Sequence, residues 1–113
     1  MTTTVPSSSR RPLVLVHGLW DTPHLFRRLV RRLEVHDVPL LVPHLPHRLG
    51  AVPLRTLAEQ LDDHIRRRWG DDMDVDLLGF SMGGIIGRVW LQQLGGARRT
   101  RRFVSCLLYT SPS

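Results

Sequence analysis

The chain consists of short, largely apolar runs that alternate with longer amphipathic stretches. These runs occupy residues 13–16, 38–42, 75–80 and 102–105. The first of them, Leu13–Val16, is unbroken, as is typical of a strand that is buried on both faces of a parallel sheet. We therefore predict four strands, of which the second is interrupted near its start by Pro39.

Apolar residues recur every three or four positions between these runs, and this spacing predicts helices. Pro23 and Pro53 suit the first position of a helix, and Gly70 and Gly95 follow the last. The apolar face of the helix after Ser81 is predicted to consist of Ile85, Ile86, Val89, Trp90 and Leu94. The three predicted helices occupy residues 23–37, 53–69 and 82–94.

The alternation of strand and helix predicts an α/β fold in which right-handed crossovers build a parallel sheet. We expect a three-layer α/β/α sandwich with helices on both faces of the sheet. A chain of 113 residues forms one domain at most. We predict that this domain occupies residues 12–105 and that residues 1–11, which are rich in Thr, Ser and Arg, form a flexible arm.

The chain carries a formal net charge of +6, and all its basic residues apart from histidine are arginines. A nucleic-acid-binding protein would show a basic patch interleaved with aromatic residues, or a known binding motif. The arginines instead fall in small groups, most of them on the polar sides of the predicted helices. We therefore do not expect a nucleic-acid partner, although a basic nucleic-acid binder stays open as a third alternative.

Several other classes of site and location are disfavoured by what the sequence lacks. Cys106 is the single cysteine, so no internal disulfide can form. No secretory signal, no apolar run long enough to span a membrane and no paired metal-ligand spacing is visible. Without lysine there is no Walker-type phosphate loop. We expect a soluble, cytoplasmic protein without a metal or cofactor, and its oligomeric state stays open.

The strongest chemical signal is Gly79-Phe80-Ser81-Met82-Gly83, which matches the pattern G-x-S-x-G. The pattern lies between a predicted strand and a predicted helix. In that context a nucleophilic serine sits on a sharp turn, which small residues two positions before and after it allow to close. The helix N-terminus after the serine favours negative charge at the site. The simpler interpretation, a serine that caps a helix, leaves both glycines unexplained.

A second motif, His17-Gly18-Leu19-Trp20, follows the first apolar run. Together the two motifs resemble those of α/β-hydrolases of the lipase and esterase kind, including small microbial triacylglycerol lipases, over about residues 12–105. The resemblance implies Ser81 as the nucleophile and the backbone N–H groups of Leu19 and Met82 as the oxyanion hole. It implies supporting roles for Gly79 and Gly83 in the turn and for His17 and Gly18 in the loop. It also implies the strand order second, first, third, fourth.

This family arranges its catalytic triad in the chain order serine, acid, histidine. No histidine and no acidic residue follows Ser81, since Asp76 is the last acid in the chain. His17 precedes the nucleophile and is therefore a poor base. Asp76 begins the strand that ends beside Ser81, which places it roughly 16 Å away at about 3.3 Å per residue. His44, near the end of the second strand, either lines the mouth of the pocket or is an ordinary loop residue.

The last eight residues, 106–113, resemble the translation of a transposase-based sequencing adaptor, and we expect them not to be native. The chain is thus interpreted as a truncated α/β-hydrolase fold of about four strands, catalytically inactive by itself. The parent activity implied by the resemblance is hydrolysis of acyl esters or lipids through a Ser81 acyl-enzyme. An acyltransferase or thioesterase of the same fold, and a non-catalytic interaction protein, are the alternatives.

Overall fold

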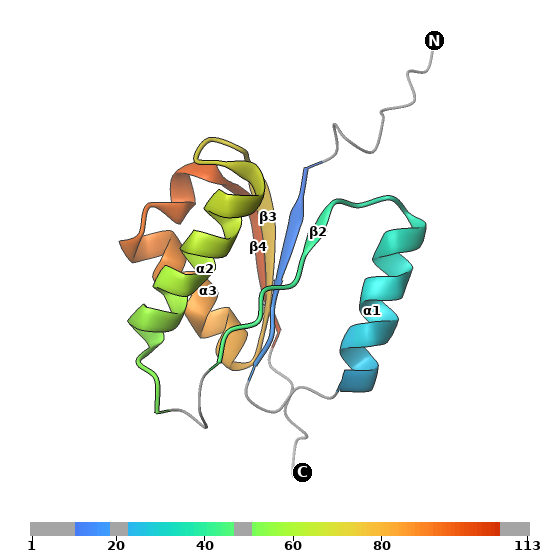
Figure 1. Ribbon diagram of the computed structural model, residues 1–113, viewed down its shortest axis with the longest axis horizontal. Coiled ribbons are helices and arrows are strands. Elements are labelled where there is room, and N and C mark those ends of the chain that lie inside the picture. The colour runs from blue at the N-terminus through green and yellow to red at the C-terminus, as the bar shows by residue number, and fades with distance from the viewer. Residues whose placement is uncertain (1–10, 19–22, 47–50, 107–113) are drawn as a thin grey trace.

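The computed structural model describes residues 11–18, 23–46 and 51–106, with only the backbone described for residues 23–26. Strands and helices alternate along these residues (Figure 1). The elements are β1 (Leu13–Val16), α1 (Pro23–Val35), β2 (Leu40–Leu41), α2 (Leu54–Trp69), β3 (Val75–Phe80), α3 (Met82–Gln93), the short 3-10 helix η2 (Gly96–Arg99) and β4 (Thr100–Cys106).

The four strands form one parallel sheet in the order β2-β1-β3-β4, which confirms the predicted fold class and strand order. In the register between β1 and β3, Leu13 lies opposite Asp76 and Val16 lies opposite Gly79. The carboxyl ends of the two central strands therefore lie side by side. The loop that follows β1 and the turn that follows β3 leave the sheet at the same edge.

The helices cover the two faces of the sheet unequally. Helices α2 and α3 lie together on one face, and α1 lies on the other (Figure 1). The main apolar core lies between the α2–α3 layer and the sheet. Most of its side chains have no exposure to solvent. Its fully buried members include Val14, Val16, Leu57, Ala58, Leu61, Ile65, Val75 and Trp90.

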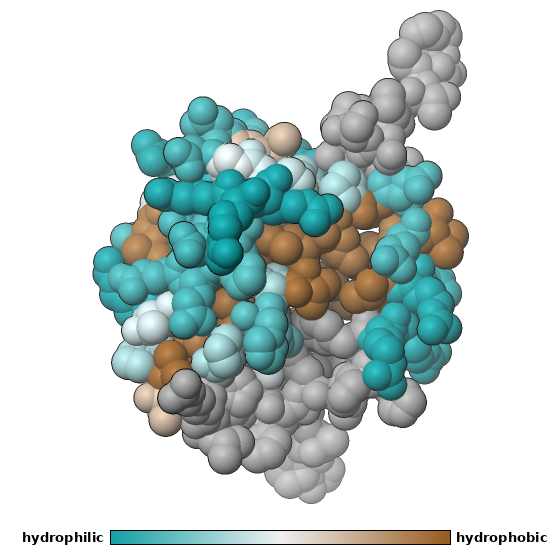
Figure 2. Space-filling view, in the orientation of Figure 1, coloured by the Kyte–Doolittle hydropathy of each residue, from teal (hydrophilic) through white to brown (hydrophobic). Residues whose placement is uncertain are grey.

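Helix α1 packs more loosely than α2 and α3. None of its residues from 27 to 35 is buried, although the helix has an apolar face. A hollow of about 530 Å³ separates it from β3 and is lined by Arg28, Leu29, Arg32, Leu78 and Phe80. Figure 2 shows apolar residues at the surface between α1 and the helices of the opposite face.

The strand lengths differ from those predicted at 38–42 and 102–105. Strand β2 contains only Leu40 and Leu41, because β1 pairs with it only through Leu13 and Val14 and because Pro43 has no N–H to extend the ladder. Strand β4 is longer than predicted, since its pairing with β3 begins at Thr100 and continues to Cys106.

Two helix predictions also need correction. Ile85, predicted on the apolar face of α3, is 50% exposed. Its neighbour Ile86 faces the core instead, since successive helical residues point about 100° apart. Pro53 is the N-cap residue of α2 rather than its first helical residue, because its ψ of 145° is extended.

No helix in the described part of the chain is both long enough and apolar enough to cross a lipid bilayer.

Candidate active site

Ser81 occupies the single position between the last residue of β3 and the first residue of α3. Its backbone angles are φ 56° and ψ −121°. Among the described non-glycine residues only Asp37 shares a positive φ. Such a conformation costs on the order of 1–3 kcal/mol and persists only where the surrounding structure enforces it. The Ser81 side chain makes no capping hydrogen bond to α3, which argues against a simple helix cap.

Two backbone hydrogen bonds hold the Ser81 turn in this strained conformation. The Ser81 N–H donates to the carbonyl oxygen of Cys106, at the end of the neighbouring strand, over 2.6 Å. The Gly84 N–H donates to the Ser81 carbonyl oxygen over 2.9 Å. The turn is therefore fixed both to the sheet and to the first turn of α3.

The glycines on either side of Ser81 are required by close backbone approaches. A Cβ atom on Gly79 would lie 2.6 Å from the carbonyl oxygen of Gly83, inside the same turn. A Cβ atom on Gly83 would lie 2.1 Å from the carbonyl oxygen of Val16, on the neighbouring central strand. A larger residue at Gly79 would force α3 away from β3, and one at Gly83 would force α3 away from β1; either would open the turn.

The loop after β1 contacts the Ser81 turn directly through Gly18. A Cβ atom there would lie 2.5 Å from the Phe80 carbonyl oxygen, 2.9 Å from Ser81 Cβ and 3.2 Å from the Met82 backbone nitrogen. The backbone of Gly18 thus lies against the turn and beside the first N–H groups of α3, which have no acceptor within the helix. The second predicted oxyanion donor, Leu19, lies outside the described residues.

His17 connects the loop after β1 to the segment after β2. Its Nε2 accepts a hydrogen bond from the Leu45 N–H over 3.2 Å. Since Nε2 is the acceptor, the neutral ring carries its proton on Nδ1, which lies 3.3 Å from the Gly18 carbonyl oxygen. The imidazole therefore links the loop after β1 to the segment after β2. Its role as an organiser of this loop stays a prediction.

His44 stacks on the ring of His17, with 6.1 Å between ring centroids and 23° between planes. Its own side chain is exposed. The sequence placed His44 at this edge of the sheet, but nothing in the spacing of the two histidines indicated the stack. The contact arises because β2 pairs with β1 in parallel, so the segments after both strands meet.

Two acidic residues that precede Ser81 in the chain, Asp76 and Asp62, have structural partners. Asp76 pairs with Arg11 over 3.0 Å at the end of β3 opposite to Ser81. Asp62 accepts a hydrogen bond from the Trp90 indole over 2.9 Å and pairs with Arg66. In the described parts of the chain, no three His, Cys, Asp or Glu side chains gather to hold a metal ion.

The strain at Ser81 predicts a measurable effect of glycine at this position. We expect Ser81→Gly to have a free energy of unfolding about 1 kcal/mol higher than Ser81→Ala, because glycine adopts a positive φ without a steric penalty. Urea unfolding followed by circular dichroism would measure the difference. Equal stability of the two variants would mean that the turn is relaxed.

Comparison with known proteins agrees with this architecture. A model of the alpha/beta hydrolase family matches residues 13–112. A solved structure of an extracellular alpha/beta-hydrolase from a Paenibacillus species superposes with a TM-score of 0.71 at 22% sequence identity. That protein is described as sharing structural and functional homology with tobacco Salicylic Acid Binding Protein 2. The match covers 90% of this chain but only 43% of the Paenibacillus chain.

No curated protein matches the sequence. The family model nevertheless covers most of the chain, and the structural neighbour has the same fold. The chain therefore belongs to the alpha/beta hydrolase family.

Proposed function

We propose that this chain carries the nucleophile of a serine hydrolase that acts on carboxylic esters, as lipases and esterases do. The observation that supports the proposal most directly is the strained backbone of Ser81, whose side chain does not cap the helix. Strain of this kind concentrates at functional sites, where the surrounding structure enforces it. The turn also lies beside the N-terminus of α3, where negative charge is favoured.

In the proposed reaction, Ser81 Oγ attacks the ester carbonyl carbon and a C–O bond forms. The carbonyl oxygen becomes an oxyanion, which the N–H groups of Leu19 and Met82 stabilise. Collapse of this intermediate breaks the bond to the alcohol and leaves an acyl group on Ser81. Water then gives a proton to the base and attacks the acyl carbon, the bond from that carbon to Ser81 Oγ breaks, and the carboxylic acid is released as Ser81 regains its proton. A histidine takes the proton from Ser81 and passes it to the departing alcohol oxygen.

The proposal assigns that histidine, and the acid that orients it, to a part of the protein outside this sequence. All six histidines of the chain precede Ser81, whereas the family order places the base after the nucleophile. Without these groups, only about 10³–10⁴-fold catalysis would be expected from binding and the oxyanion hole. We therefore expect the 113-residue chain alone to show no turnover that depends on Ser81 as a nucleophile.

A fluorophosphonate probe tests the assignment of the nucleophile. We expect it to label Ser81 in the protein encoded by the uninterrupted reading frame, and Ser81→Ala to abolish both labelling and hydrolysis of a short-chain nitrophenyl ester. In the 113-residue chain, ester hydrolysis should equal that of its Ser81→Ala variant. If the 113-residue chain hydrolysed the ester and Ser81→Ala abolished this activity, the claim that the catalytic base lies outside this sequence would be wrong. If the probe did not label the longer protein, the assignment of Ser81 as the nucleophile would be wrong.

Product analysis separates hydrolysis from acyl transfer, which the same turn can support. With an ester and an added acceptor alcohol, a hydrolase releases mainly the free acid, whereas an acyltransferase forms a new ester. A thioesterase would prefer the corresponding thioester. A non-catalytic member of the fold would react with neither substrate and would not be labelled.

A further inference from the structure

Helix α1 carries four arginines within six residues, Arg27, Arg28, Arg31 and Arg32. Outside α1, five of the ten described arginines make ion pairs with nearby carboxylates; these are Arg11, Arg55, Arg66, Arg67 and Arg101. On α1, Arg28, Arg31 and Arg32 are exposed and pair with no carboxylate in the described parts of the chain. Positive charge is therefore concentrated on this helix.

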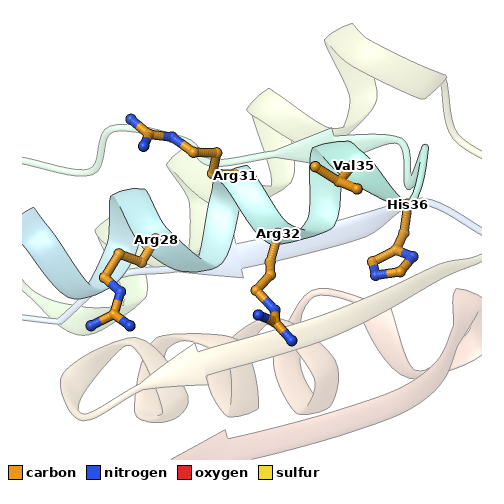
Figure 3. Close-up of a pocket in the computed structure, with 5 residues that line it drawn as sticks. All are labelled: Arg28, Arg31, Arg32, Val35 and His36. Atoms are coloured by element: carbon orange, nitrogen blue, oxygen red, sulfur yellow. The ribbon is translucent and has the colours of Figure 1, made fainter.

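The arginines of α1 surround two adjoining hollows. Arg28, Arg32 and His36 extend toward one side of the helix, each about one turn from the next, and Arg31 extends to the other side (Figure 3). The first hollow, of about 400 Å³, is lined by these four residues and Val35. The second, of about 420 Å³, is lined by Arg27, Val30, Arg31, Glu34 and Val42.

Exposed apolar side chains lie among the arginines that line the two hollows. Val35, the last residue of α1, is 76% exposed, and Val42, just after β2, is 38% exposed. Among described residues 27–37, the acids are Glu34 and Asp37, against four arginines. On a lipid surface, the guanidinium groups would pair with the phosphates of the headgroups, and the exposed aliphatic side chains would contact the hydrocarbon beneath them.

We propose that α1 docks this protein on an anionic phospholipid surface. Clusters of four or more basic residues on an amphipathic helix are typical of binding to anionic lipids. A nucleic acid fits less well, because binding to single strands relies on aromatic platforms, and residues 27–36 contain none. The proposal is independent of ester hydrolysis, because it concerns the helix and not Ser81.

Sedimentation with vesicles tests this proposal on the 113-residue chain. We expect binding to vesicles of phosphatidylglycerol and phosphatidylcholine in equal parts, and little binding to phosphatidylcholine alone. The triple variant Arg28→Gln, Arg31→Gln, Arg32→Gln should partition about 100-fold less strongly, because each arginine near an anionic surface contributes about a factor of five. Raising the salt concentration to 0.5 M should weaken the wild-type binding through screening.

A second triple variant controls for net charge. Arg66→Gln, Arg67→Gln, Arg68→Gln removes the same charge from the exposed last turn of α2, and we expect less than about a threefold loss. Replacing the three α1 arginines by lysine should retain binding, and so should Ser81→Ala. Equal losses in the two glutamine triples, or equal binding to both kinds of vesicle, would overturn the proposal. Retention on duplex DNA that depends on α1, without vesicle binding, would overturn it in favour of a nucleic acid.

Discussion

Gly83→Ala is expected to lower the free energy of unfolding by at least about 3 kcal/mol. In an exposed helix this substitution would instead stabilise the protein by up to about 1 kcal/mol, because alanine has the higher helix propensity. The sign reverses here because the new Cβ would lie 2.1 Å from the Val16 carbonyl oxygen and 2.7 Å from that of His17. Both oxygens belong to the backbone at the end of β1, so no rotation of a side chain can relieve the contact.

Gly70→Ala provides the matched comparison. A Cβ atom at Gly70 would meet nothing within 4 Å, but its φ of 81° and ψ of −165° lie in a region that almost only glycine adopts, so a purely conformational cost of about 1–3 kcal/mol is expected. Urea unfolding of both variants, followed by circular dichroism, would measure the two costs. If Gly83→Ala were as stable as the wild-type protein, α3 would not lie against β1 as described.

The close approach at Gly83 has a consequence for the proposed chemistry. Because α3 contacts the end of β1 there, the first N–H groups of the helix lie beside the loop that contains Gly18. The same packing that makes Gly83 intolerant of a side chain therefore brings both proposed sources of oxyanion donors to Ser81. Stability and the proposed active site depend on one backbone contact, so substitutions in this turn should affect both.

The sheet could be predicted because its central strands are buried on both faces. Strand β3 covers Val75–Phe80, as predicted, since a short, largely apolar run that ends at the glycine turn has no competing helical pattern. The turn at Ser81 could be predicted for a related reason. Glycines two positions before and after a serine, between a strand and a helix, have a steric explanation that the local sequence already contains.

Contacts between distant segments could not be predicted in this way. Nothing in the sequence distinguished Arg99 from the other grouped arginines, but this residue is only 9% exposed. Its guanidinium group donates hydrogen bonds to the carbonyl oxygens of Gly70 and Met73, in the connection before β3. This role depends on where η2 meets that connection, and neither segment has a periodic pattern that would reveal it. The stack of His17 and His44 could not be predicted either, because it also joins two segments that are distant in the sequence.

Trp90→Ala is expected to have the second large effect, a loss of about 3–5 kcal/mol in the free energy of unfolding. Trp90 is fully buried where α2, α3 and η2 meet. Its ring fills the space beside Gly96 so closely that a Cβ atom there would lie 2.5 Å from the indole. Replacement by alanine would leave a cavity between rigid helices, which can relax only in part.

Comparison with Trp90→Phe separates the packing of the ring from its hydrogen bond. Phenylalanine keeps most of the apolar contact but removes the indole N–H that donates to Asp62 over 2.9 Å. Since Asp62 also pairs with Arg66, its carboxylate would retain a partner, and we expect a loss of only about 1–2 kcal/mol. Thermal and urea unfolding of the two variants would measure both losses. Equal losses would mean that the hydrogen bond, and not the filling of the core, makes this residue important to the α2–α3 layer.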